Sequence, residues 1–193
     1  MSRGLLIGLV LLVVLCVAGC SSYNGLVGKD QAVKGQWANV QSAYQRRSDL
    51  IPNLVNTVQG AANFEKSTLT AVIQARASAT QVQLKTDDLS PEKIKQFQAA
   101  QDQLGSSLSR LLVSVEQYPQ LKANQNFLEL QAQLEGTENR INVERDKFNG
   151  MVKDFNASAL SFPTVLFAKI FGFPAKGFFE ASQAAQTAPT VKF

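Results

Sequence analysis

The sequence predicts an all-α protein: an antiparallel up-and-down four-helix bundle with long first and last helices, carrying an N-terminal signal and lipid anchor. Apolar residues recur at spacings of three and four along most of residues 30–161, which is the pattern of helices that bury one face. Proline and helix-cap signals divide this pattern into four segments with short connections, as in an up-and-down bundle. No segment shows a convincing alternation of apolar and polar residues, so no strand is expected.

The chain has 193 residues, enough for one core and one domain. We expect five regions along it. They are a lipoprotein signal peptide at residues 1–19, a lipid-anchored tether at 20–28, the helical bundle at 29–161, a phenylalanine-rich segment at 162–180, and a disordered tail at 181–193.

The first twenty residues have the composition of a secretory signal. A short basic start ending at Arg3 precedes a nearly continuous apolar run over residues 5–18, and small residues then precede Cys20. A cysteine directly after the cleavage point is the signature of a lipoprotein, in which the thiol carries diacylglycerol and the freed amine is usually acylated. The run is shorter than the roughly 20 apolar residues of a spanning helix, so lipidation of Cys20 is favoured. An uncleaved single-pass anchor is the alternative.

Removal of the signal leaves 15 acidic residues and 18 basic ones, which is the total of 19 less Arg3. This mild charge gives no basic patch for nucleic acid, so none is expected as a partner. The two cysteines, Cys16 and Cys20, lie in the signal and at the lipid position, so the mature domain has no disulfide and depends on its core. We expect the domain outside the cytoplasm in the cell envelope, anchored to the cytoplasmic membrane or, in a host with two membranes, to the outer one.

The first predicted helix runs from Asp30 to about Asn63. Two seven-residue series form its buried stripe: Val33, Val40, Arg47 and Leu54, and Trp37, Tyr44, Ile51 and Val58. Arg47 stands where an apolar residue is expected. Pro52 lies inside the helix, where it removes one hydrogen bond and frees the carbonyl of Ser48, at a cost of about 3 kcal/mol. A helix keeps such a pair of exceptions only where its surroundings compensate for them.

Three further helices follow. Residues 65–83 predict a short second helix, with Arg76 near its seam and with Leu69, Val72, Ile73, Ala79 and Val82 facing inward. The third begins at Ser90-Pro91-Glu92, an N-cap followed by proline and an acid in the first turn, and ends at Pro119. The fourth runs from Asn124 to about Ser161 and is closed by Pro163. Its buried series is Phe127, Leu134, Ile141, Phe148 and Phe155.

Residues 162–179 hold six of the 12 phenylalanines, interrupted by prolines and glycines. One interpretation is an exposed segment that binds the membrane interface or a partner. The favoured interpretation is that the segment folds back over one end or groove of the bundle.

Several motifs together resemble the LemA family over essentially the whole mature chain. They are Tyr23-Asn24, Arg46-Arg47-x-Asp49-Leu50-Ile51-Pro52-Asn53-Leu54-Val55, Ala75-Arg76-Ala77, Glu138-Asn139-Arg140-Ile141, Phe148-Asn149, Phe155-Asn156, and Phe162-Pro163 with Gly172-Phe173. The resemblance implies a mostly antiparallel helical bundle displayed outside the cytoplasmic membrane, without an established enzymatic activity. Members of this family often begin with a transmembrane helix, whereas this sequence has a lipobox.

The residue types needed for most catalysis are missing. The chain has no histidine, which excludes a Ser-His-Asp triad and any His-bearing metal site. Cys20 would be acylated, and the glycine spacing of residues 172–177 lacks the Lys-Ser/Thr of a phosphate loop. We therefore expect no catalytic residue, cofactor or metal. A carboxylate-dependent hydrolase remains the enzymatic alternative, with Glu135, Glu138, Glu144 and Asp146 as its candidates.

The middle of the bundle is expected to hold a polar layer. The mid-points of the first and last helices should lie at one level, which brings Arg47 opposite Glu138 and Arg145 on the fourth helix. We expect Glu138 to pair with Arg47, and Arg140 or an asparagine to reach the carbonyl freed by Pro52. The alternative is a wet groove for a partner. The full layer comprises Arg47, Asp49, Pro52, Asn53, Arg76, Glu138, Asn139, Arg140, Arg145 and Asn149.

These observations favour a non-enzymatic envelope scaffold or adaptor that is held to the membrane by the lipid on Cys20 and binds another envelope protein. The alternatives are a bundle that binds lipid or a small molecule under the phenylalanine-rich segment, and the same scaffold held by an uncleaved helix.

Overall fold

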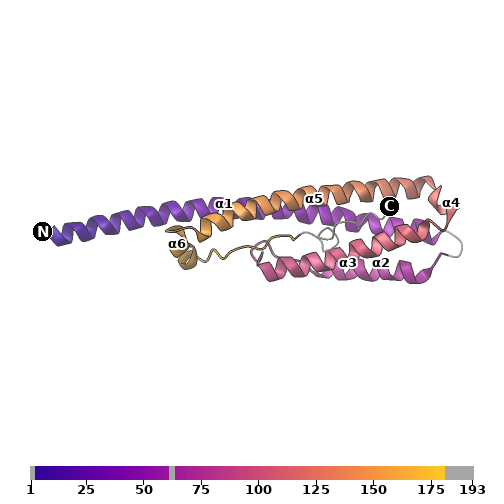
Figure 1. The fold of residues 1–193 in the computed structure, drawn as a ribbon, viewed down its shortest axis with the longest axis horizontal. Helices are drawn as coiled ribbons and strands as arrows, with labels where there is room; N and C mark the ends of the chain where they lie inside the picture. Colours follow the sequence, from indigo (N-terminus) through magenta and orange to yellow (C-terminus); the bar gives the residue numbers. More distant parts are fainter. Residues whose placement is uncertain (1–2, 61–63, 181–193) are drawn as a thin grey trace, which may run out of the picture.

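The computed structural model describes residues 3–60 and 64–180, and within these residues it is all-α, with no strand (Figure 1). The prediction of an all-α helical bundle is confirmed. The helices are α1 (Arg3–Gln59), α2 (Lys66–Gln81), α3 (Pro91–Val115), α4 (Pro119–Lys122), α5 (Gln125–Leu160) and α6 (Thr164–Phe171).

The two long helices, α1 and α5, run antiparallel along most of the molecule, and α2 and α3 form a hairpin that packs beside them (Figure 1). The four therefore alternate in direction, as an up-and-down bundle requires. The N-terminal part of α1 projects beyond the bundle as a single helix. We call the end from which it projects the base; α6 lies there, beside α1.

The helix ends follow local signals. Ser90 is the extended residue before α3, and Pro91 takes the first helical position. The side chain of Asn124 caps α5 by accepting hydrogen bonds from the backbone N–H groups of Asn126 (2.9 Å) and Phe127 (3.3 Å). Gly172 ends α6 with a φ of 74°, a left-handed conformation that glycine adopts without strain.

The first helix differs most from the prediction. It begins at Arg3 instead of Asp30, so the residues expected to form a tether, 20–28, are helical. Gly25 and Gly28 each cost a helix about 1 kcal/mol relative to alanine, but Leu26 between them is buried in the core and offsets that cost. Two short helices, α4 and α6, also lie in segments where none was expected, and Ile73 is half exposed instead of facing inward.

The heptad series form the core as the spacing predicts. Every member of the series on α1 and α5 is buried, and Trp37 is fully buried at the centre of the half of the bundle nearer the base. Its ring contacts those of Phe97 on α3 and Phe148 on α5, with centroids 5.2 and 5.5 Å away. A second cluster, built from Leu54, Leu104 and their neighbours, fills the opposite half.

The chain after α6 runs as an extended strap, residues 172–180, back along the bundle (Figure 1). Phe179 is buried and packs against Trp37, Phe97 and Phe148. This part of the phenylalanine-rich segment is therefore packed against α1, α3 and α5. Residues 181–193, predicted to be disordered, lie outside the described residues.

Three side-chain amides hold the backbone of the strap. Asn149 on α5 donates to the carbonyl of Phe179 and accepts from its N–H, both at 2.9 Å. Asn156 makes the same pair of bonds with Lys176 at 2.9 and 2.8 Å, and Gln98 on α3 does so with Glu180 at 2.9 and 3.0 Å. Each amide thus satisfies both backbone groups of one strap residue, as a neighbouring β-strand would.

A charge cluster ties the strap to α1. Lys176 is buried, and its ammonium lies 2.6 Å from the carboxylate of Asp30, which also contacts Lys34 at 3.0 Å. Burial by itself raises the pKa of Asp30, but the hydrogen bonds from Lys176 and Lys34 outweigh it and hold that pKa below its usual value of 3.8. The ionised form of Asp30 is therefore the form that the fold stabilises.

The stability of this cluster should depend on pH. Because the pKa of Asp30 is lower in the folded chain than in the unfolded chain, its contribution is fully present above about pH 4 and is lost as the pH falls through the folded-state pKa. Thermal melts of the native chain should therefore lose more stability between about pH 5 and pH 2 than melts of Asp30→Asn, which is less stable at neutral pH. Equal acid sensitivity of the two chains would contradict this account.

Candidate functional site

The middle of the molecule carries a polar layer centred on Arg47 of α1. Its guanidinium is buried and donates to the Glu138 carboxylate of α5 at 2.6 Å and to the Gln101 side-chain oxygen of α3 at 2.8 Å. It also lies over the ring of Tyr44, 5.1 Å from the centroid. The structure thus brings Arg47 and Glu138 together, and Gln101 supplies a partner that the sequence did not indicate.

The two ends of this ion pair differ in their access to water. The side chain of Arg47 is 5% exposed, whereas that of Glu138 is 49% exposed. The layer is therefore open on the α5 side, in contrast to the buried pair that was expected. The buried cation depends on its acceptors on Glu138 and Gln101, whereas the carboxylate can be hydrated if the cation is removed.

Pro52 is accommodated by an arginine from α2. Arg76 Nε donates to the carbonyl of Ser48, the group that Pro52 leaves without its helical partner, at 2.9 Å. The expectation that Arg140 or an asparagine would reach this carbonyl is wrong. Arg140 is exposed and pairs with Glu144 instead, at 3.1 Å. The helix hairpin places Arg76 beside α1, which the spacing within one helix cannot reveal.

The other expected members of the layer have separate surroundings. Arg145 does not pair with Glu138, because it donates to the carbonyl of Glu180 at 2.9 Å and lies over the ring of Phe179. Asn149 binds the backbone of the strap at Phe179. Pro52 and Asp49 are exposed, and Asp49 accepts from Gln45. Asn53 and Asn139 are also exposed, and their side chains make no hydrogen bond with the part of the chain that the structure describes.

A second polar contact lies between α1 and α5, nearer the base. Gln36 donates to the side chain of Glu144 at 2.7 Å and to its carbonyl at 3.1 Å, and both residues are buried. The hydrogen bond from Gln36 lowers the pKa of Glu144, with Lys147 and Arg140 acting in the same direction against the effect of burial. The sequence did carry a signal for this contact, since Glu144 occupies a seam position three residues after Ile141.

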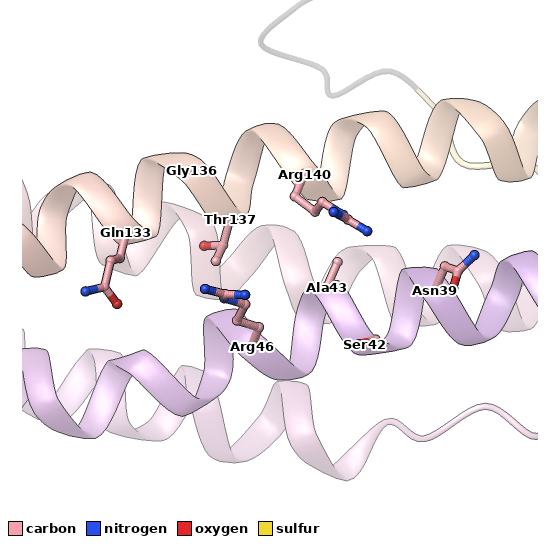
Figure 2. Close-up of a pocket in the computed structure, with 8 residues that line it drawn as sticks. All are labelled: Asn39, Ser42, Ala43, Arg46, Gln133, Gly136, Thr137 and Arg140. Atoms are coloured by element: carbon pink, nitrogen blue, oxygen red, sulfur yellow. The ribbon is translucent and has the colours of Figure 1, made fainter.

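Beside the polar layer, an open groove of about 370 Å³ lies between α1 and α5. Figure 2 shows the guanidinium groups of Arg46, from α1, and Arg140, from α5, in the space between the two helices. Gly136 of α5 is one of the lining residues, and a Cβ added at this glycine would meet open space. Its lining residues are Asn39, Ser42, Ala43, Arg46, Gln133, Gly136, Thr137 and Arg140.

The groove is electropositive. Its lining includes two arginines and no carboxylate. Arg140 forms an ion pair with Glu144. Arg46, in contrast, forms no ion pair or hydrogen bond with any side chain among residues 3–60 and 64–180. An unpaired guanidinium that lies along a concave surface is suited to bind a carboxylate or another oxyanion.

The carboxylates offer little for catalysis or metal binding. Glu138 is paired with Arg47, and Glu144 with Gln36 and Arg140. Within the described ranges, no three His, Cys, Asp or Glu side chains lie close enough together to hold a metal ion. The charged and polar groups that line the groove are arginine cations, side-chain amides and hydroxyls.

The N-terminal part of α1 has a different surface. Eleven large apolar side chains between Leu5 and Val17 are exposed around the whole helix. Of the described helices, α1 is the one whose length and composition suit a membrane span, a description that a signal sequence near the N-terminus also meets. Cys20 is exposed directly after this run, with a free thiol.

The comparisons with known proteins give one family. A family model described as "LemA family" matches residues 36–193, which leaves the apolar run and Cys20 outside the match. The chain is similar to Protein LemA of Metamycoplasma hominis, with 25% identity over 83% of this chain and 69% of that protein. It is also similar to Magnetosome protein MamQ of Magnetospirillum gryphiswaldense, with 25% identity over 86% of this chain and 67% of that protein. Magnetosome protein MamQ 2 of Paramagnetospirillum magneticum is 24% identical over the same shares.

The asymmetry of the Arg47–Glu138 pair leads to a prediction for stability. Glu138→Leu leaves a buried guanidinium without its carboxylate and should cost about 2 kcal/mol. Arg47→Met leaves a carboxylate that water can hydrate and one unpaired amide oxygen, and should cost about 1 kcal/mol. The free energy of unfolding of the double variant should be close to that of Arg47→Met. Urea melts of the full chain in detergent, followed by the fluorescence of the single tryptophan, Trp37, measure these values.

Glu135→Leu is the matched control, because Glu135 is an exposed glutamate of α5 that contacts Gln131 and not the layer. Its effect should stay within about 0.5 kcal/mol. A larger loss from Arg47→Met than from Glu138→Leu, or single effects that simply add, would contradict the geometry described for the pair.

Proposed function

The chain belongs to the LemA family, and on that basis we propose that it is a non-enzymatic scaffold or adaptor of the cell envelope. It is held to a membrane at its base, with the bundle outside the cytoplasm, and binds an acidic segment of another envelope protein in the groove between α1 and α5. The observation that carries this proposal is the pair of arginines, Arg46 and Arg140, in an open groove without a lining carboxylate.

The anchor is proposed to be the lipid on Cys20. Small residues precede this cysteine, and it is exposed. It also lies between Gly19 and Tyr23, which contact α6 at the base of the bundle, where a lipid could enter a bilayer without crossing the fold. The alternative is that the apolar run of α1 stays attached and spans the membrane itself. Both forms display the same bundle on the same side.

The groove lies far from the anchor. Residues 20 and 46 belong to one continuous helix, so the rise per residue separates them by about 39 Å. A partner could therefore bind without approaching the bilayer. Arginine forms bidentate hydrogen bonds with carboxylates, so an acidic side chain or a C-terminal carboxylate is the expected contact group.

An enzymatic role has less support. Glu138 and Glu144, the candidate carboxylates near the groove, are already paired with arginine or glutamine. Neither the family description nor the names of the relatives refer to a reaction. A lipid-binding bundle also has less support, because the aromatic rings of the strap and the core already fill the space beneath residue 179.

The anchor predicts a specific mass. The intact mass of the membrane-extracted protein should show that residues 1–19 are absent and that Cys20 carries a diacyl or triacyl adduct. Cys20→Ala should block both processing and acylation, whereas Cys16→Ala, in the signal, should leave them unchanged. An unmodified full-length mass would exclude the lipid anchor and support the uncleaved helix.

If a partner binds in the groove, a crosslinker placed in the groove should capture it. A photo-reactive benzoylphenylalanine at Gly136 should yield a discrete adduct with one envelope protein in cells, through an acidic segment identified by mass spectrometry. The control position is Gly150, a second glycine of α5 with open space at its Cβ but outside the groove. It should not yield that adduct.

Charge reversal tests whether the arginines carry this interaction. Arg46→Glu should reduce the Gly136 adduct about tenfold or more, equivalent to at least about 1.4 kcal/mol, because it places like charges together. Lys153→Glu, with the same change of net charge on the exposed surface of α5, should not reduce it. An adduct unaffected by Arg46→Glu would show that the groove is not the partner site.

A further inference from the structure

The base of the molecule carries an uncovered apolar surface. Its members, which we call the base patch, are Leu160, Phe162, Leu166, Ile170 and Phe171. Phe162 is 83% exposed and Ile170 is 75% exposed, values unusual for such large apolar side chains in a folded domain. Leu166 and Ile170 are four residues apart on α6, so they lie on one face of the helix, and Phe162 lies in the turn before it.

The opposite face of α6 is fixed to the protein. Ala168 is buried, and the ring of Phe167 approaches α1 so closely that a Cβ at Gly19 would lie 3.2 Å from it. Phe171, at the edge of the base patch, also packs its ring edge-on against Tyr23, with centroids 5.1 Å apart. Because α6 is held on one side by α1 and continues into the strap, the base patch is directed away from the bundle.

The contacts of α6 also fix its level along α1. They occur at Gly19 and Tyr23, directly after the exposed apolar run that ends at Val17. If Cys20 carries the lipid, residues 1–19 are absent, and the acyl chains enter the bilayer beside the contact at Tyr23. If α1 remains intact, its apolar run leaves the bilayer at the same residues. Both anchors therefore place the surface of the membrane at the level of α6.

We infer that α6 is an interfacial helix, and that the base patch lies in the headgroup–acyl boundary of the bilayer that holds the N-terminal anchor. This inference rests on the membrane anchor of the proposed function but not on the groove. Lipid is the occupant that the geometry favours, because α6 packs on α1 directly after the exposed apolar run, at the residues where either form of the anchor meets the bilayer. Lys169, exposed on α6, can extend its ammonium toward the headgroups.

Insertion of α6 gives the protein a second contact with the bilayer, and this contact restricts the orientation of the bundle. A single flexible attachment would leave the bundle free to tilt, whereas a helix packed on α1 and inserted beside the anchor restricts its orientation. The groove would then be presented at a set height above the membrane. The base patch and the groove are thus separate surfaces with separate partners.

The test uses the membrane-extracted protein, reconstituted into vesicles of phosphatidylethanolamine and phosphatidylglycerol. The vesicles also contain phosphatidylcholine brominated near the top of its acyl chains. Bromine quenches tryptophan emission only at short range. Ile170→Trp places a reporter in the base patch, and Val113→Trp places one at a similarly exposed apolar site on α3. The native Trp37, buried in the core, serves as an unquenched reference in both chains.

The brominated lipid should quench most of the emission added by Ile170→Trp and none of that added by Val113→Trp. Leu166→Asp in the Ile170→Trp chain should restore the emission, because a charge at an exposed position opposes insertion without altering the core. Vesicle flotation is measured on the same samples. If the vesicles float but the emission of Ile170→Trp is not quenched, the interfacial helix is overturned and the anchor is left intact. The same holds if that emission is blue-shifted without quenching, because the patch is then covered by protein and not by lipid. Failure to float would overturn the anchor and the interfacial helix together.

Discussion

The pairing of three side-chain amides with the strap is the interaction on which the arrangement of this molecule depends. An extended segment that enters a helical bundle has no strand beside it, so its buried backbone groups would lack partners. Asn149, Asn156 and Gln98 supply six hydrogen bonds to that backbone. They make the strap part of the fold, position Phe179 against Trp37, and hold α6 at the base.

Polar groups on the seam give the long helices a defined register. Helices with a repeated apolar pattern can slide by a turn or more at little cost, because one apolar contact replaces another. Arg47 finds acceptors on both α5 and α3, Arg76 satisfies the carbonyl that Pro52 frees, and Gln36 reaches Glu144. A shift would leave these groups unpaired, so we expect them to contribute to uniqueness more than to net stability.

The sequence was sufficient for features that depend on local periodicity. Heptad spacing predicted the four principal helices, and cap and proline signals located most of their ends. Contacts between helices were harder to predict, because periodicity does not indicate which neighbouring helix a polar residue contacts. Arg76, and not Arg140, donates to the carbonyl of Ser48. The start of α1 was also missed, because Gly25 and Gly28 suggest a break that the burial of Leu26 overcomes. The sequence favoured a phenylalanine-rich segment that folds back on the bundle, but it did not indicate which residues hold the strap, because its partners are amides, which have no periodic pattern.

The central claim, that the strap is a structural element of the bundle, is tested most directly by residue-resolved hydrogen exchange. The backbone N–H groups of Lys176, Gly177, Phe179 and Glu180 all donate to bundle groups, whereas that of Phe178 meets no acceptor among the described residues. Exchange should therefore be slow at those four amides and fast at Phe178, and Asn149→Ala should accelerate Phe179 first. Uniformly fast exchange from residue 173 to residue 180 would contradict the account.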